Sequence, residues 1–129
     1  MRASILVSVL AIALLPDQSL AQRVRVTGSS PSEAKLAAID EATTVVSVGL
    51  IRQYASLLNR LDPKCKEDRT LVGDIAAKGV ELLREEKGVR TSILKFLQAM
   101  DDSIPEEGAS LNLSCAEVAA ALVVMIDRP

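Results

Sequence analysis

The first apolar segment of the chain is the eleven-residue run Ile5–Leu15, which follows a single basic residue, Arg2, and ends at Pro16. Ser19-Leu20-Ala21 then places small residues where a signal peptidase recognises its substrate. This pattern predicts a cleavable signal peptide over residues 1–21. The alternatives are a buried core helix and a membrane anchor, but the run is shorter than the roughly 20 residues that span a bilayer.

Residues 22–29 alternate between polar and apolar side chains, which predicts an extended lead or a short edge strand. Residues 30–33 (SPSE) have the pattern of a capping box with proline at the first helical position. Apolar residues then recur every three or four positions from Leu36 to Leu61, as on one face of a helix. The β-branched residues of 43–48, followed by Gly49, leave open a kink or break near Gly49.

The sequence predicts two more helices in the middle of the chain. The first begins near Asp68 or Thr70 and ends at Lys87-Gly88, a basic last turn followed by a glycine cap. The second is capped by Thr91 or Ser92 and ends before Pro105. Its expected inward positions are Ile93, Phe96, Leu97, Met100 and Ile104.

A last helix begins at a second capping box, in which Ser114 is followed three residues later by Glu117. Its body, Val118–Ile126, is apolar on every side, and nine residues are too few to cross a membrane. We therefore expect this helix to lie at the centre of the fold. The predicted fold class is all-α: a small bundle of about four helices in one domain, residues 22–129.

Two cysteines, Cys65 and Cys115, are present, and both belong to the predicted mature chain. In an oxidising compartment they are expected to form one intramolecular disulfide, which would stabilise the fold by about 4 kcal/mol in the chain-entropy estimate. The alternatives are two buried free thiols or an intermolecular bond. The predicted location is secreted or periplasmic.

Composition excludes several classes of protein. The 129 residues are 49% hydrophobic and 25% charged, which excludes a disordered tail, and a net charge of −2 does not suit an electrostatic nucleic-acid binder. The sequence contains no histidine and no glycine-rich phosphate loop. Histidine-dependent catalysis, histidine-bound zinc and axial-histidine haem are thereby excluded. We assign no catalytic residue, cofactor site or metal site.

Three polar segments have alternative interpretations. Asp101–Gly108 contains four carboxylates but lacks the spacing of a calcium loop, so a solvated loop is the favoured interpretation. The charged residues from Glu81 to Lys87 are expected to form a solvated helix face. Asn112 begins an N-x-S triplet, which leaves glycosylation open, although Ser114 is explained by its helix cap.

The chain resembles two families in outline. Small exported chorismate mutases also combine a signal peptide with an all-α fold. That resemblance implies cationic side chains converging on a dicarboxylate, with Arg52 and Arg60 as candidates. The helices between Cys65 and Cys115 resemble periplasmic immunity proteins, which neutralise a secreted toxin; the likeness covers about half of the chain. Neither resemblance is carried by a sequence motif.

We expect the protein to bind a protein partner rather than to catalyse a reaction, and we expect no membrane span in the mature chain. The alternatives are an arginine-using enzyme of the mutase type and a periplasmic immunity or inhibitor protein. An enzyme of that type needs several cationic side chains in one pocket with apolar walls. The candidates for that pocket are Arg52, Arg60, Lys78, Arg84, Arg90 and Lys95.

Overall fold

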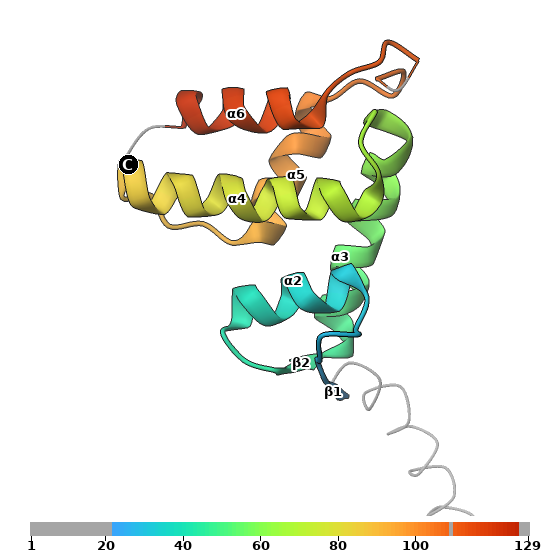
Figure 1. The fold of residues 1–129 in the computed structure, drawn as a ribbon, viewed down its shortest axis with the longest axis vertical. Helices are drawn as coiled ribbons and strands as arrows, with labels where there is room; N and C mark the ends of the chain where they lie inside the picture. The colour runs from blue at the N-terminus through green and yellow to red at the C-terminus, as the bar shows by residue number, and fades with distance from the viewer. Residues whose placement is uncertain (1–21, 109, 127–129) are drawn as a thin grey trace, which may run out of the picture.

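The computed structural model describes residues 22–108 and 110–126, so the predicted signal peptide lies outside the described residues. Within them the chain is mostly helical (Figure 1), which confirms the predicted helical class. The helices are α2 (Ser32–Glu41), α3 (Val48–Leu61), α4 (Arg69–Lys87), α5 (Ile93–Ser103) and α6 (Cys115–Met125). The remaining elements are the strands β1 (Arg23–Arg25) and β2 (Val45–Ser47) and the 3₁₀ helix η1 (Asp62–Lys64).

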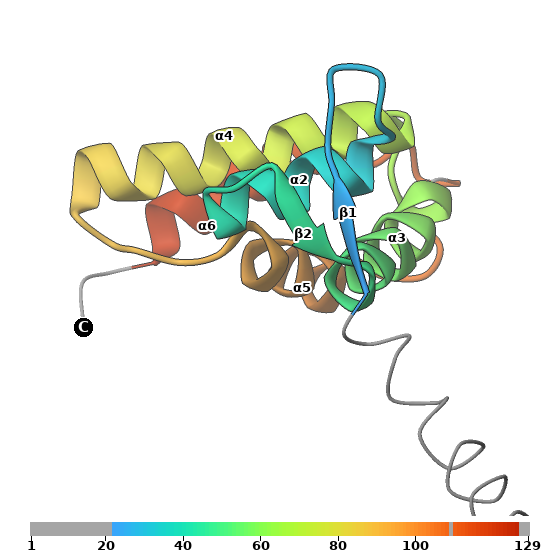
Figure 2. The same cartoon turned by 90° about the horizontal axis from the view of Figure 1, so that it is seen from below.

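A two-stranded sheet lies at one end of the molecule, beside α2 and α3 (Figure 1). β1 and β2 pair antiparallel, with Val24 opposite Val46. Figure 2 views the molecule from this end and shows both strands in front of the helices. The edge strand predicted within residues 22–29 is therefore confirmed, and its partner comes from a segment that was expected to be helical.

The helix predicted from residue 30 to Leu61 is interrupted, as the alternative of a break near Gly49 allowed, because the chain leaves the helical conformation after Glu41. Ala42 has a φ of 53° and ends α2 in the left-handed conformation. The β-branched residues that follow favour an extended backbone, and Val46 is fully buried in β2. α3 then begins at Val48, so the break precedes Gly49, which lies inside α3.

The capping box predicted at residues 30–33 is also wrong. Pro31 is itself the N-cap residue of α2, and no side chain caps the helix there. The hydroxyl of Ser30 instead accepts a hydrogen bond from the backbone N–H of Thr27 at 2.9 Å, which closes the turn after β1. Glu33 accepts a hydrogen bond from Arg69 at 2.9 Å and ties α2 to the start of α4.

The predicted boundaries of α4 and the start of α5 are confirmed. Asp68 accepts a hydrogen bond from the N–H of Leu71 at 2.9 Å, and Ser92 accepts one from the N–H of Lys95 at 3.0 Å. Both are N-cap bonds that satisfy a donor with no partner inside its helix. Gly88 ends α4 with a φ of 65°, a conformation that costs glycine little.

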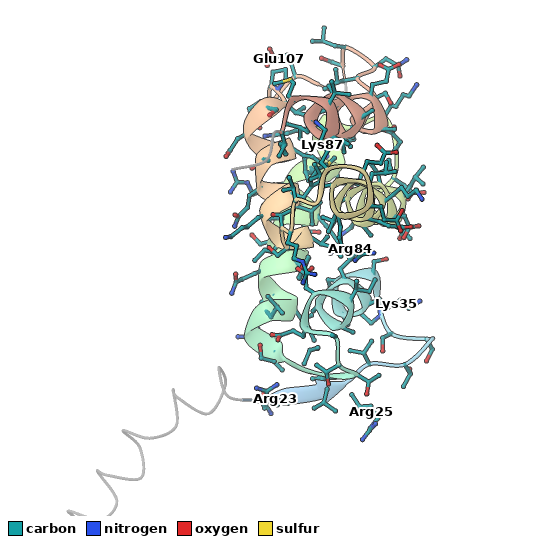
Figure 3. All side chains as sticks on the ribbon, turned by 90° about the vertical axis from the view of Figure 1, so that its left-hand side faces the viewer. Arg23, Arg25, Lys35, Arg84, Lys87 and Glu107 are labelled. Carbon is teal, nitrogen blue, oxygen red and sulfur yellow. A yellow bond between two sulfur atoms is a disulfide. The ribbon has the colours of Figure 1, made fainter. Side chains whose placement is uncertain are left out.

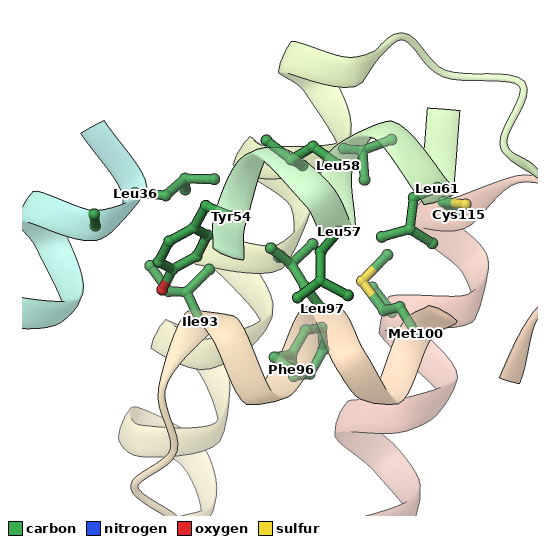
Figure 4. Close-up of a cluster of buried hydrophobic side chains, with 14 of the residues drawn as sticks. Leu36, Tyr54, Leu57, Leu58, Leu61, Ile93, Phe96, Leu97, Met100 and Cys115 are labelled. Carbon is green, nitrogen blue, oxygen red and sulfur yellow. The ribbon is translucent and has the colours of Figure 1, made fainter. Parts of the chain in front are cut away.

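The hydrophobic core lies where α3 and α5 face one another, with contributions from α2, α4 and α6 (Figure 4). Tyr54, Phe96 and several leucines are its largest buried side chains. All five residues predicted to face inward from α5 and its end are buried, which confirms the helical periodicity of that segment.

The prediction that the last helix is central is wrong. α6 lies at the edge of the molecule, where it packs mainly against α4 and α5 (Figure 1). Its buried residues are Cys115, Ala119 and Val123, whereas Val124 and Met125 are 74% and 70% exposed. An all-apolar sequence allows every face of a helix to be buried. Which faces are buried depends on how many other helices pack against it. No helix in the described part of the chain is long and apolar enough to cross a membrane.

α4 and α5 cross closely at Gly79, where the ring of Phe96 occupies the space that a larger side chain would need. A Cβ atom at Gly79 would lie 2.5 Å from Cζ of Phe96 and 2.7 Å from Cε1. At Gly73, on the same helix, a Cβ would meet only the flexible end of Leu36, at 3.0 Å from Cδ1.

We predict that Gly79→Ala lowers the free energy of unfolding by about 1–3 kcal/mol. Overpacking against the buried ring should exceed the gain of about 1 kcal/mol that alanine brings to a helix interior. Gly73→Ala is the matched control and should cost less, because Leu36 can rotate away. Chemical denaturation of both variants checks this, and an equal or larger loss in Gly73→Ala would contradict it.

Candidate functional site

The first turn of α6 is attached to the segment just before α4. Cys65 and Cys115 lie at disulfide distance, with their Cα atoms 5.4 Å apart. The carboxylate of Glu67 accepts hydrogen bonds from the N–H groups of Cys115 at 2.8 Å and Ala116 at 3.1 Å, and from the hydroxyl of Ser114 at 2.9 Å. These contacts fix where α6 begins.

The cap of α6 agrees only in part with the predicted capping box. Ser114 accepts a hydrogen bond from the N–H of Glu117 at 3.3 Å, as expected. The carboxylate that completes the cap comes from Glu67, which lies 47 residues before Ser114. Burial alone would raise the pKa of Glu67, but the hydrogen bonds from Cys115, Ala116 and Ser114 outweigh it and hold the pKa below its ordinary value.

Cys65, Glu67 and Cys115 also bring three possible metal-ligand atoms within 4.8 Å of one another. A metal would require both sulfurs as thiolates and a carboxylate oxygen with free lone pairs. Here the sulfurs are paired at disulfide distance, and both oxygens of Glu67 accept hydrogen bonds. The cluster is therefore explained as a helix cap beside a disulfide.

The last turn of α6 is held by a lysine at the end of α4. The ammonium of Lys87 donates hydrogen bonds to the carbonyl oxygens of Val124 at 2.7 Å and Ile126 at 2.8 Å. Lys87 lies between α4 and α6 in Figure 3. Glu67, just before α4, binds the start of α6, and Lys87, at the end of α4, binds the end of α6. The two helices therefore run parallel. A negative group at the start of α6 and a positive group at its end both complement the helix dipole.

α5 has the same arrangement of charges at its two ends. The carboxylate of Asp40, on α2, accepts hydrogen bonds from the N–H groups of Ile93 at 2.8 Å and Leu94 at 3.2 Å, and from the hydroxyl of Tyr54. Lys64 donates hydrogen bonds to the carbonyl oxygens of Asp101 at 3.3 Å and Ile104 at 3.4 Å.

Asp101 corrects the prediction that the acidic segment is wholly solvated. Its neighbours Asp102, Glu106 and Glu107 are exposed, but Asp101 is only 4% exposed. Its carboxylate lies 2.8 Å from the ammonium of Lys64 and 2.6 Å from the guanidinium of Arg60. The hydrogen bond to Asp101 raises the pKa of Lys64 above its ordinary value, although burial acts against it.

An uncovered apolar surface lies on the outward side of α6. It consists of Ala120, Ala121, Val124 and Met125, all exposed, and we call it the α6 face. Beside it, a shallow cavity of about 200 Å³ lies between α4 and α6, lined by apolar residues such as Ile75, Leu82 and Val123. The sequence indicated the apolar composition of α6 but not which of its faces stays open.

A larger cavity of about 550 Å³ lies between the end of α2, the second half of α4 and the segment that joins α4 to α5. Arg84 and Arg90 line it, and we call it the arginine cavity. Of the other candidate cations, Lys78 lines the smaller cavity and Arg60 pairs with Asp101. Arg52 and Lys95 are exposed and line neither of these two cavities.

Comparisons of the chain with protein-family models, with curated proteins and with solved structures give no match. The function is therefore inferred from the geometry of these surfaces.

We predict that Asp101→Asn lowers the free energy of unfolding by about 3 kcal/mol, because the buried ammonium of Lys64 then keeps only the exposed carboxylate of Glu106, at 3.5 Å, as a charged partner. Asp102→Asn, one residue further along the same helix and exposed, should change it by less than about 0.5 kcal/mol. Denaturant unfolding of the two variants gives the comparison. Equal stabilities would show that the buried ion pair is not needed for the fold.

Mass spectrometry of non-reduced protein should recover one cross-linked peptide pair that joins Cys65 to Cys115. The 5.4 Å separation of the two Cα atoms is within the range of native disulfides. After reduction and alkylation, both cysteines should carry the label. Two alkylated thiols in the non-reduced sample, or a disulfide-linked dimer, would contradict the prediction.

Proposed function

We propose that the chain is a small exported protein that binds a protein partner through the α6 face. The observation that carries this proposal is the exposure of Val124 and Met125, at 74% and 70%, on a helix without a charged residue between Val118 and Ile126. Contiguous exposed apolar surface is uncommon on monomers and often marks an interaction site.

The geometry of α6 favours binding because the helix is already held in place. Glu67 fixes its first turn and Lys87 its last turn, so little conformational entropy is lost when a partner docks. The neighbouring cavity between α4 and α6 provides space for an apolar side chain of the partner. A stable interface of about 800 Å² on each side would extend from the α6 face onto the exposed residues of α4.

Export is supported by two independent features. Residues 1–21 have the composition of a signal peptide, and Cys65 and Cys115 lie at disulfide distance, as suits an oxidising compartment. The mature domain proposed here is residues 22–129. A toxin-neutralising immunity protein is one kind of exported binding protein that would present such a face.

The alternative of a mutase-type enzyme has less support from the geometry. Arg60 pairs with Asp101, and Arg52 is exposed on α3 away from both cavities. Of the six candidate cations only Arg84 and Arg90 line one cavity with apolar walls, and Arg52 and Arg60 do not join them there. Two cations in one pocket are fewer than the several that such an enzyme needs.

Site-specific photo-crosslinking in cells tests the proposal. A photoreactive residue at Val124 should give a crosslink to one protein of the cell envelope, whereas the same residue at the exposed Gln53 of α3 should not. Met125→Glu should abolish the crosslink from position 124, because a carboxylate on the α6 face resists desolvation.

Gln53→Glu is the matched charge control and should leave the crosslink intact. Both substitutions are at exposed positions and should leave the melting temperature nearly unchanged. A crosslink that survives Met125→Glu would contradict the α6 face as the binding site. Turnover of a small dicarboxylate that is lost in Arg52→Ala or Arg60→Ala would support the enzyme instead.

A further inference from the structure

The arginine cavity has the size and walls of a small-molecule site. Its volume of about 550 Å³ is within the range of roughly 300–1,000 Å³ that is typical of ligand pockets. Ile39, Ala77, Val80 and Ile93 supply apolar surface from three separate elements. The side chain of Ile39 is 61% exposed, so it offers apolar surface to a ligand in the cavity. Such walls favour a ligand with an apolar body.

Two guanidinium groups in this cavity have no partner within the described part of the chain. Neither Arg84 nor Arg90 donates a side-chain hydrogen bond or forms an ion pair there, whereas Arg60 and Arg69 each pair with a carboxylate. Arg84 extends from α4 into the space toward α2 (Figure 3). An unpaired guanidinium offers five donors in a planar fork that matches a carboxylate.

The two acidic residues that line the same cavity are already paired. Asp40 accepts hydrogen bonds from the N–H groups of Ile93 and Leu94 and from Tyr54, so the start of α5 balances its charge. The carboxylate of Glu81 lies 3.5 Å from the ammonium of Lys78, and it forms no ion pair with Arg84 or Arg90. The guanidinium donors of Arg84 and Arg90 therefore stay available to a ligand.

We propose that the arginine cavity binds an organic anion with a carboxylate head and an apolar body. The carboxylate would accept hydrogen bonds from Arg84 and Arg90, and the body would lie against Ile39, Ala77 and Val80. Guanidinium–carboxylate pairs are strong because both partners are charged and the bonds form in parallel. This site is separate from the α6 face, and the proposal does not depend on the protein partner.

Isothermal titration calorimetry with octanoate tests this proposal on the mature chain. Octanoate should bind with a one-to-one stoichiometry. Octan-1-ol, which has the same body without the charge, should bind at least about tenfold more weakly, and so should inorganic phosphate, which has no apolar body. Arg84→Gln and Arg90→Gln should each weaken octanoate binding about tenfold.

Arg52→Gln is the matched control, since Arg52 is exposed like Arg84 and Arg90 but lines neither cavity. This variant should bind octanoate like the unaltered protein, and Met125→Glu should do the same, because it lies on the α6 face. Absence of octanoate binding would overturn the proposal. So would equal affinity for octan-1-ol or phosphate, or unchanged affinity in both Arg84→Gln and Arg90→Gln.

Discussion

The attachment of α6 at both of its ends is the constraint on which the C-terminal half of the fold depends. α6 contributes Cys115, Ala119 and Val123 as buried residues and Val118 and Leu122 as partly buried ones, so only one side of the helix packs against the core. An isolated helix of eleven residues is also marginal in water. Glu67 and Lys87 supply partners for the backbone groups that the first and last turns leave unpaired. They thereby hold a weakly buried helix in one position beside α4.

The use of the same device on α5 links the two halves of the chain. Asp40, from the N-terminal half, caps the start of α5, and Lys64, which follows α3, binds the carbonyl groups at its end. Hydrogen bonds to charged groups are worth more than neutral ones, about 1.5–3 kcal/mol each. In a small domain with a modest core, these long-range caps add to the packing in holding the helices in position.

The sequence predicted those features whose cause lies within a few residues. Asp68, Ser92 and Ser114 each cap the helix that follows directly, and the inward positions of α5 follow from its own periodicity. The break before α3 was only partly predictable, because β2 forms by pairing with a strand about twenty residues earlier. Features set by distant partners could not be read from local pattern.

Three such features decide the candidate sites. Asp101 is buried because Lys64 and Arg60 reach it from another element. The α6 face is exposed because few helices pack around α6, and an all-apolar sequence does not predict the number of those neighbours. The contact of Glu67 with α6 could have been predicted from one feature of the sequence. Glu67 lies two residues from Cys65, so a bond from Cys65 to Cys115 places the Glu67 carboxylate near the start of α6.

The bond between Cys65 and Cys115 also divides the molecule topologically. When it forms, residues 65–115 become a covalent ring that contains all of α4 and α5, while β1, α2, β2 and α3 lie on the N-terminal tail of that ring and α6 on its C-terminal tail. A protease that cuts once inside the ring, for example in the turn after Gly88 or near Pro105, leaves both tails joined through the sulfurs. A single cut before Cys65 separates the N-terminal tail from the ring, so the two halves differ in how they tolerate proteolysis.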